Sequence, residues 1–524
     1  MPTDVTPGAP TAMQVDHPSV LRPPGSSAPD ERAAQPAYFA DLHLDQVVAA
    51  ITKGREPYDL EASFHVPLRD PDCIAYRHEV FHDLDDADLR DDVEAFAETM
   101  RRRRMFARRA TAARNPLRSQ RLVLDAASTY CHAITALERA LARTGVRSRG
   151  LRSVAAYVAA YARAPAFDTL RADVERLERQ LDSITYRLTL HDDRIRVRKA
   201  SAQHDYGEEI ERTFRKFARR SGAARTLDDG DRFDMNHVEA AILAMVARLH
   251  GETFDALAAF ASRHAEYVDP MVERFEHEVQ FYLAYIAHVR RFESLGLHFC
   301  LPSVSTADGQ ISAEGVFDLA LAATIQREGG EIVTNDFRLS AAERLFVITG
   351  ANQGGKSTFA RTFGQLHHLA ALGCPVPGRT ATLALFDDLL THFEREEDLR
   401  TLQGKLQEEL TRLHGLLERA TPRSIVIMNE SFSSTATADA AELGRATLRR
   451  LLEIGVIGVY VTFIEELSTL DERIVSLTAT VDPIDPTRRT FEIVRRRADG
   501  RAHALAIART YGLTYEELRR RLGA

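Results

Sequence analysis

The stretch "LFVITGANQGGKSTFARTFGQL", residues 345–366, decides the fold class of this chain. An apolar run of β-type residues leads into "GANQGGKS", residues 350–357, and a helical pattern follows. This spacing is that of G-x-x-x-x-G-K-[ST], in which glycines let backbone N–H groups approach phosphates and the lysine reaches the outer oxygens. The helix that follows directs its positive N-terminus at the same anion. The sequence therefore predicts a phosphate-binding loop between a buried strand and a helix.

The loop assigns a predicted role to each of its polar positions. Lys356 would reach the β- and γ-oxygens of a triphosphate, and the Ser357 hydroxyl would ligate magnesium. The predicted cofactors are accordingly ATP and Mg²⁺. The predicted nucleotide contacts are Gly350, Asn352, Gly354, Gly355, Lys356, Ser357, Thr358 and Asn429.

A second stretch, "RSIVIMNES" at 423–431, reads as a buried strand that ends in Asn429 and Glu430. In nucleotide hydrolases of this architecture the strand end supplies an Asp to the magnesium shell, and a following carboxylate can position water. Asn429 can hold a magnesium-bound water through its carbonyl but adds no negative charge. We therefore expect a slow ATPase that binds magnesium weakly, with Glu430 and Lys356 as catalytic residues. The alternative is that Asn429 and Glu430 merely cap a strand.

The pattern changes along the chain and predicts its domains. Residues 1–37 are rich in Pro, Ala, Gly and Ser, which favours a disordered tail. Residues 38–305 carry apolar residues at helical spacing, which favours a core or lever domain of long helices with a small β-hairpin at about 184–199. Residues 306–524 alternate β-rich runs with helical segments, which together with the phosphate loop predicts an α/β P-loop ATPase domain.

The composition limits the partners and the cellular compartment that the chain can have. The chain has 524 residues and a formal net charge of -8, so any contact with nucleic acid must come from a local basic patch. Four scattered cysteines without a CxxC pair fit a reducing cytoplasm better than a disulfide or metal framework. No apolar run approaches the roughly 18 residues of a membrane span. We expect a cytoplasmic protein without membrane contact.

The two motifs and the segments around them resemble the MutS family of DNA mismatch-repair ATPases. "TGANQGGKST" is similar to the family's "TGPNMGGKST", and "LGCPVPG" at 372–378 is similar to its "GCFVPA". "DDLLTHFEREEDL", "ATPRSIVIMNESFSSTATADA" and "VYVTFIEEL" resemble three further family segments. The resemblance covers roughly residues 332–470 with high specificity and the helical part more weakly. It implies that the α/β P-loop ATPase domain at 306–524 is of the ABC/MutS-like type.

The resemblance implies roles for further residues, and the sequence departs from the family pattern at three positions. It makes Glu430 the water-positioning carboxylate and implies a homodimer that shares ATP between subunits. Asn429 replaces the family's magnesium Asp, Phe463 stands in place of its switch His, and "GK" at 404–405 replaces a Ser-Thr pair. The implied contacts to the partner subunit's nucleotide are Gly404, Glu409, Thr435 and Asp439.

DNA is the partner that the resemblance implies, with doubtful mismatch specificity. We expect this MutS-like protein to lack the family's N-terminal mismatch-recognition domain, because the helical pattern begins near residue 38. Nine arginines and no acidic residue lie between Met100 and Leu122, and such a cluster can bind phosphates. The alternative is a solvated helix face or pairing with acidic neighbours. The candidate DNA contacts are Arg101, Arg102, Arg104 and Arg108.

Three functions remain open on the sequence. The first is a dimeric DNA-binding ATPase of repair or recombination whose ATP state moves a helical lever. The second is a nucleotide-gated scaffold that binds ATP and dimerises with negligible hydrolysis, favoured by Asn429 and Phe463. The third is a chromosome-maintenance type ATPase. The segment "LQGKLQ" matches the signature of that class poorly, and Lys356 and Glu430 lie close together in the sequence.

Overall fold

The computed structural model describes residues 18–26, 34–191, 194–200, 235–305, 310–394, 404–433, 435–482, 488–497 and 514–522. Part of the predicted disordered tail lies outside these ranges, but residues 18–26 contradict the prediction. Val20 is fully buried, and both its N–H and the Ser19 hydroxyl donate to the Glu278 carboxylate at 2.8 Å. This segment therefore has the composition of a tail but is anchored, by a buried apolar side chain, by the Glu278 carboxylate and by hydrogen bonds from Tyr76 and Tyr282 to its backbone.

The chain divides into two compact units. One unit contains residues 1–83, 148–150 and 277–524, and the other contains residues 84–147 and 151–276. The predicted boundary at residue 305 therefore differs from the observed division. The N-terminal helices belong with the C-terminal sheet, and a periodic pattern alone could not reveal which partner their apolar faces cover.

A six-stranded sheet forms the core of the first unit within the described ranges. Five neighbouring strands run parallel, and the last strand is antiparallel to its neighbour. The buried parallel strands are continuous apolar runs, as the sequence predicts for strands that are covered on both faces. In spatial order they are β10 (Leu389–Phe393), β11 (Ile425–Asn429), β12 (Ile457–Val461), β7 (Leu345–Gly350), β13 (Ile474–Val481) and β14 (Arg489–Arg495).

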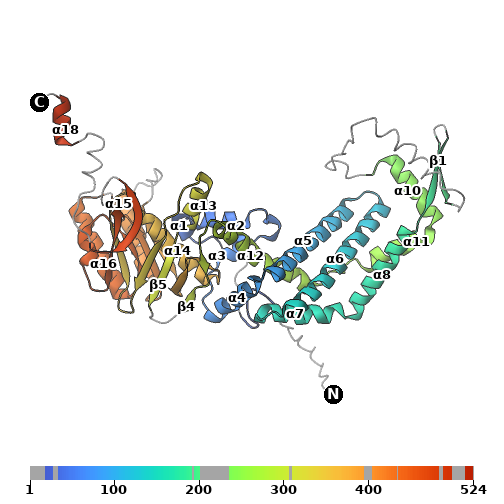
Figure 1. Ribbon diagram of the computed structural model, residues 1–524, viewed down its shortest axis with the longest axis horizontal. Helices are drawn as coiled ribbons and strands as arrows, with labels where there is room; N and C mark the ends of the chain where they lie inside the picture. Colours follow the sequence, from blue (N-terminus) through green and yellow to red (C-terminus); the bar gives the residue numbers. More distant parts are fainter. Residues whose placement is uncertain are drawn as a thin grey trace, which may run out of the picture. The chain divides into compact units, whose positions relative to one another are not determined.

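Helices cover both faces of this sheet (Figure 1). On one face Phe346 of β7 contacts the rings of Phe359 and Phe363, which belong to α14 (Lys356–Ala371). On the other face the alternate residues of β7 share an apolar core with α15 (Lys405–Arg419) and α16 (Thr437–Ile454). The alternation follows from the period of two along a strand.

The N-terminal helix α1 (Tyr38–Leu42) packs on α14 and β10. The Tyr38 hydroxyl contacts His368 Nδ1 at 3.1 Å, and the Thr391 hydroxyl donates to Asp41 at 2.6 Å. A side chain at Gly364 would lie 2.6 Å from Leu42, so the missing Cβ permits this close approach. The further helices of the unit are α2 (Leu44–Thr52), η1 (Glu56–Tyr58), α3 (Glu61–His65), α4 (Pro71–Leu84), α13 (Leu319–Glu328), η2 (Glu465–Thr469) and α18 (Tyr515–Leu522).

Two smaller sheets also belong to the first unit. One is a four-stranded sheet and the other pairs two very short strands, both counted within the described residues. The four-stranded order is β4 (Ser303–Ser305), β9 (Thr380–Ala384), β5 (Ile311–Val316) and β6 (Asn335–Leu339), and the short pair is β3 (Phe299–Cys300) with β8 (Val376–Pro377).

The second unit is built on helices. Asp86 and Asn115 cap its two longest helices, each side chain accepting hydrogen bonds from two backbone N–H groups. Residues 237–293 form three helices, which are separated near Gly251 and before Pro270. The elements are α5 (Ala87–Ala112), α6 (Pro116–Thr144), α7 (Arg149–Ala162), α8 (Pro165–Asp182), β1 (Tyr186–His191), β2 (Arg194–Lys199), α10 (His237–Leu249), α11 (Gly251–Arg263) and α12 (Pro270–Glu293), of which α7 and α12 extend across the division between the units.

The strands β1 and β2 form an antiparallel hairpin in the range where the sequence predicts one. Among the described residues, no helix is both long and apolar enough to cross a membrane. The four cysteines are all free thiols.

Candidate nucleotide-binding site

The two motifs meet at one edge of the central sheet. Asn429 of β11 pairs with Val461 of β12, and Val461 pairs with Ile348 of β7. Because these strands are parallel, the segments that follow them leave from the same edge, where ligands bind in open α/β sheets. The fold thus brings residues 350–358 together with Asn429 and Glu430.

The backbone of the phosphate loop depends on its glycines. Gly350 and Gly355 have φ angles of 105° and 90°, a region that side chains other than glycine adopt only with strain. A Cβ at Gly350 would lie 2.9 Å from the Ala479 carbonyl oxygen, and one at Gly354 would lie 2.9 Å from the Ala351 carbonyl oxygen. The loop can therefore pack tightly only with glycine at these positions.

Lys356 is almost completely buried and folds back over the loop. Its Nζ donates to the Gly350 carbonyl at 2.8 Å, to the Asn352 Oδ1 at 3.2 Å and to the Ala351 carbonyl at 3.4 Å. Phosphate oxygens offer an ammonium group the same kind of acceptor with more charge. The arrangement therefore holds Lys356 where it can exchange these acceptors for a phosphate.

The electrostatics of Lys356 link the two motifs. Burial lowers the pKa of Lys356, the negative charge of Glu430 opposes this lowering, and the positive charge of Arg489 adds to it. Glu430 therefore lies within electrostatic reach of the lysine that the sequence assigns to the phosphates. Ser357 and Thr358 occupy the first turn of α14, directly after the loop.

Asn429 fits the role of a neutral group beside a magnesium ion. Its Oδ1 is buried and accepts no hydrogen bond from any residue within the described ranges. A buried carbonyl without a donor is unfavourable, so the position suits a donor brought by a ligand, such as a metal-bound water. Among the described residues, no group of three or more His, Cys, Asp or Glu side chains could hold a metal ion. Ser357 and Asn429, the residues that the sequence assigns to Mg²⁺, would hold the ion together with phosphate oxygens and water.

Phe463 follows β12 at the same edge of the sheet. It comes two residues after Val461, which lies between Ile348 and Asn429 in the sheet register. Its ring is 46% exposed and has no hydrogen-bonding group, so it cannot contact a γ-phosphate as a histidine would.

Two residues of β14 complete the site, and the sequence reasoning did not identify them. Arg489 donates through Nε to the Asn352 carbonyl at 3.1 Å, although 137 positions separate them in the chain. Phe491 has a φ angle of 59°, and its carbonyl accepts from the Asn335 side chain at 3.2 Å. The stretch "RTFEIVRR" indicated only a strand, since no short motif joins β14 to the loop.

An apolar pocket of about 190 Å³ adjoins the phosphate loop. It borders Gly355 and Thr358 at the start of α14, and Phe491 lines it from β14. Its walls are mostly aliphatic and aromatic, which suits a flat ring system better than a charged group. The remaining lining residues are Val316, Phe317, Asp318, Leu321, Ala322, Ile325, Glu331, Ile332, Val333, Asn335, Phe359 and Thr362.

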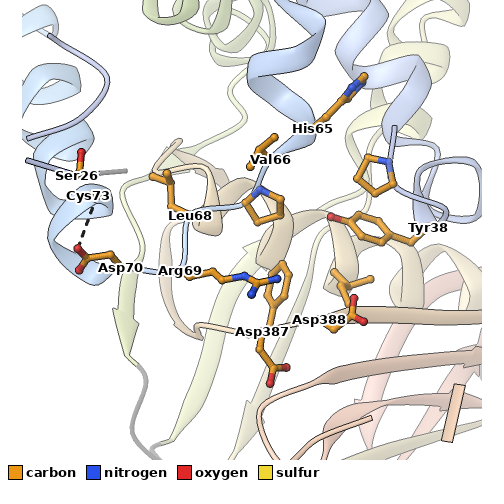
Figure 2. Close-up of a pocket in the computed structure, with 14 residues that line it drawn as sticks. Ser26, Tyr38, His65, Val66, Leu68, Arg69, Asp70, Cys73, Asp387 and Asp388 are labelled. Carbon is orange, nitrogen blue, oxygen red and sulfur yellow. Dashed lines mark hydrogen bonds between the residues drawn. The ribbon is translucent and has the colours of Figure 1, made fainter. Parts of the chain in front are cut away.

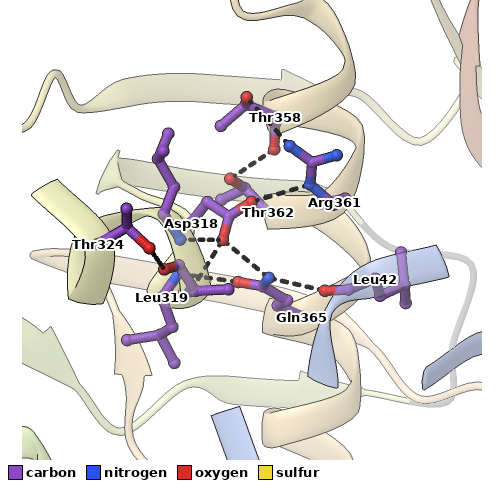
Figure 3. A network of polar contacts seen from close by, with 10 residues as sticks. Leu42, Asp318, Leu319, Thr324, Thr358, Arg361, Thr362 and Gln365 are labelled. Carbon is purple, nitrogen blue, oxygen red and sulfur yellow. Dashed lines mark hydrogen bonds and ion pairs between the residues drawn. The ribbon is translucent and has the colours of Figure 1, made fainter. Parts of the chain in front are cut away.

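A polar network fixes the beginning of α14 (Figure 3). The buried Asp318 carboxylate caps α13, pairs with Arg361 at 3.2 Å and accepts from the Gln365 amide at 3.0 Å. Arg361 also donates to the Thr358 hydroxyl at 3.4 Å, and Gln365 donates to the Leu42 carbonyl at 2.9 Å. The network therefore ties Thr358 to α13 and α1.

The predicted contacts to a partner subunit lie on two helices. Gly404 is exposed at the N-terminus of α15, and Asp439 is exposed in the first turn of α16, shortly after Thr435. Glu409 differs from these residues because it is buried, and its carboxylate accepts from the Phe432 N–H at 2.6 Å. Its carboxylate is thus engaged within its own subunit, where the resemblance had implied a contact with a partner.

The predicted DNA-contact arginines lie on α5 and point in different directions. Arg101 pairs with Glu98, and the Arg102 guanidinium lies 5.6 Å from the centroid of the Phe106 ring. Arg108 is exposed. Arg104 forms an ion pair with the fully buried Glu276. Of the four predicted contacts, Arg101, Arg102 and Arg108 are therefore exposed, and Arg114 of the wider cluster is exposed as well.

A larger cavity, of about 650 Å³, lies at the opposite edge of the sheet (Figure 2). Tyr38, Asp387 and Asp388 line it at the position where β10 begins. Asp387 accepts hydrogen bonds from Thr421 and Ser424, and Asp388 pairs with Arg419. These acids are paired within the protein, and the cavity is remote from the edge that carries the phosphate loop.

The fold and this edge define a P-loop nucleotide-binding domain, with Lys356 on the phosphate loop and Glu430 on the facing strand end. Residues 346–518 match the family model described as MutS domain V. This C-terminal part of the chain is therefore similar to a domain of the MutS family.

The similar proteins carry two names. The chain is 33% identical over 144 residues to "DNA mismatch repair protein MutS" of Lactobacillus gasseri, covering 27% of this chain and 17% of that protein. It is 33% identical over 187 residues to "Endonuclease MutS2" of Gemmatimonas aurantiaca, covering 34% of this chain and 22% of that protein. For "Endonuclease MutS2" of Thermus thermophilus the identity is 34% over 193 residues, which cover 36% of this chain and 26% of that protein. The chain thus matches about a quarter or less of the length of these relatives.

Proposed function

We propose that this MutS-like chain binds ATP with Mg²⁺ and hydrolyses it slowly. The observation that carries the proposal is the convergence at one edge of the sheet of Lys356, Glu430 and the Asn429 Oδ1, which has no partner among the described residues. A phosphate loop without the facing carboxylate would support binding alone. With Glu430 in electrostatic reach, the site contains a group that can orient water.

Each part of a nucleotide has a place in this arrangement. The adenine ring would occupy the apolar pocket beside Gly355 and Phe491. Lys356 would leave the loop carbonyls for the β- and γ-oxygens, while loop N–H groups and the α14 N-terminus stabilise the negative charge. Glu430 would accept a hydrogen bond from the attacking water and hold it in line. Bound Mg²⁺ would neutralise charge on the phosphates.

A nucleotide-gated scaffold is the second candidate, and Asn429 and Phe463 favour it. Steady-state ATP turnover of the wild type, compared with Glu430→Gln, separates the two functions, with ATP binding measured for both proteins. We expect both to bind ATP and the wild type to turn over about 100-fold faster, in line with the loss of a water-orienting group. Equal rates would contradict the hydrolase and leave the scaffold.

We further propose that the chain acts as a homodimer on DNA in repair or recombination, with ATP binding coupled to movement of the helical unit. The names of its relatives support this, since they are a mismatch-repair protein and an endonuclease. Exposed Gly404 and Asp439, at the starts of α15 and α16, and half-buried Thr435 just before α16 would meet the partner's nucleotide. Exposed arginines of α5 would contact phosphates.

The DNA proposal is tested by salt-dependent binding to perfect, mismatched and branched duplexes, with and without ATP. Phosphate contacts predict affinity that falls steeply with salt. The variant Arg102→Ala/Arg108→Ala should bind about tenfold more weakly to all three DNAs. Binding that is insensitive to salt and to these substitutions would exclude this surface as the DNA site.

A further inference from the structure

The loop that carries Glu430 has an unusual backbone. Glu430 and Phe432 have φ angles of 52° and 67°, in the left-handed region that residues other than glycine seldom occupy. Neither residue is a glycine, and Phe432 is completely buried. Such conformations persist only where the surroundings impose them, and they concentrate at functional sites.

Buried groups hold this loop at three successive points. The Glu409 carboxylate accepts from the Phe432 N–H at 2.6 Å, and Glu409 is only 5% exposed. His392 contacts the Ser431 hydroxyl through Nδ1 at 2.8 Å. The Glu430 N–H donates to the Val461 carbonyl at 2.9 Å. Each residue from 430 to 432 therefore has a partner outside the loop.

Two of these partners are joined to each other. His392 belongs to β10, and its Nε2 lies 3.3 Å from the Glu409 carbonyl oxygen. Glu409 lies in the second turn of α15, whose N-terminus is exposed at Gly404. A hydrogen bond from a backbone N–H to a carboxylate is stronger than one between neutral groups. The loop after β11 is thus fastened to α15 by a short charged contact.

We propose that Glu409 and His392 are positioning residues, which hold the loop after β11 in the conformation that presents Glu430 to the nucleotide. This inference rests on the proposed function, because the role of Glu430 is part of that function. It replaces the partner-subunit contact that the family resemblance implies for Glu409. It also means that α15 and Glu430 move together, since one carboxylate joins them.

The test compares Glu409→Ala, Glu409→Gln and Glu408→Ala as a matched control on the same helix. Glu409→Ala should lower kcat about tenfold or more while the ATP dissociation constant changes less than about threefold, because Lys356 is untouched. Glu409→Gln keeps an oxygen acceptor for Phe432 and should restore kcat to within about threefold of the wild type. Glu408→Ala should match the wild type.

Amide hydrogen exchange of residues 425–433 supplies a readout that does not depend on turnover. Protection of the Phe432 N–H should fall about tenfold or more in Glu409→Ala and stay near wild type in Glu409→Gln. Wild-type protection in Glu409→Ala, or equal losses in both variants, would overturn the proposal. A wild type that binds ATP without turnover would refute the proposed hydrolase, while the exchange result would still decide the role of Glu409.

Ser431→Ala keeps the proposal testable if Glu409→Ala does not fold. This substitution removes the hydroxyl that His392 contacts and leaves the volume of the buried loop nearly unchanged. We expect kcat to fall about threefold to tenfold with unchanged ATP affinity. An unchanged kcat together with unchanged exchange would contradict the role of His392.

Discussion

The loop after β7 takes most of its shape from its own glycines, with one hydrogen bond from Arg489, whereas the loop after β11 takes its shape from side chains elsewhere in the chain. In the first loop, Gly350 and Gly355 adopt positive φ angles and Gly354 permits a close backbone contact, and Gln353 is the one other residue of the loop with a left-handed angle. In the second loop, Glu430 and Phe432 adopt left-handed angles without glycine, and Glu409 and His392 hold them. A loop shaped mainly by its own glycines keeps its phosphate-binding conformation by itself. The conformation of a loop held by Glu409 and His392 can change when these residues move. We therefore expect substitutions in the two loops to have different effects on ATP binding, stability and turnover.

Removal of the charge from the first loop should produce the largest effect on binding. Lys356→Ala should weaken ATP binding about 100-fold, because a buried ammonium that contacts phosphates is lost. Titration calorimetry measures this loss, with Lys53→Ala as a control at an exposed position. An affinity within threefold of the wild type would show that the first loop is not the phosphate site.

Substitution of a glycine tests whether the first loop is shaped locally. Gly350→Ala should lower the free energy of unfolding by about 2 kcal/mol and weaken ATP binding, because its Cβ would meet the Ala479 backbone. Gly415→Ala is the matched control, since no atom lies within 4 Å of a Cβ at that helical position. It should leave stability unchanged or slightly higher. Equal effects of the two substitutions would contradict the claim that glycines determine the conformation of the first loop.

Acid should weaken the helix that anchors the first loop. Burial lowers the pKa of His367 and His368 on α14 to about 4, whereas an unfolded histidine titrates near 6.5. The unfolded state therefore binds more protons below about pH 6.5, and stability falls as the pH drops from about 6.5 towards 4. Each histidine contributes at most about 1.4 kcal/mol per pH unit.

Thermal unfolding between pH 7.5 and 5 measures this slope. We expect His368→Gln to remove about half of the contribution that the two histidines of α14 make, since one of them no longer takes up a proton on unfolding. Melting that does not depend on pH in this range would contradict the assignment of buried neutral histidines.

The smallest effect concerns the end of β11. Asn429→Asp should lower the Mg²⁺ concentration for half-maximal ATP turnover about fivefold, because a carboxylate adds a negative charge beside the metal. Asn115→Asp serves as the control. Asn115 caps α6, and an asparagine and an aspartate cap a helix about equally well. An unchanged magnesium requirement would count against a place for Asn429 near the metal.

The same contrast explains which parts of the molecule the sequence could predict. The phosphate loop and the strand ending in Asn429 and Glu430 were predictable because their roles follow from neighbours in the chain. The β1–β2 hairpin has the same local origin. Arg489, Phe491 and the position of α1 on α14 depend on packing between distant segments, and no local pattern encodes it.

Glu409 shows what a resemblance alone leaves out. Its position in the family segment implies a contact across a subunit interface, but burial and the short bond to Phe432 place its carboxylate inside its own subunit. Spacing along α15 could have indicated this, because Glu409 is followed by Leu413 and Leu416 on the apolar face of that helix. An acidic residue on an apolar face is buried only with a partner.

The central claim is that the two loops share one nucleotide, and hydrogen exchange tests it directly. In Glu430→Gln, which we expect to retain ATP, addition of ATP and Mg²⁺ should slow exchange both in residues 350–358 and in residues 425–433. Because the site lies between both segments, protection should rise in both at the same ATP concentration. Protection confined to residues 350–358, with residues 425–433 unchanged, would contradict the account.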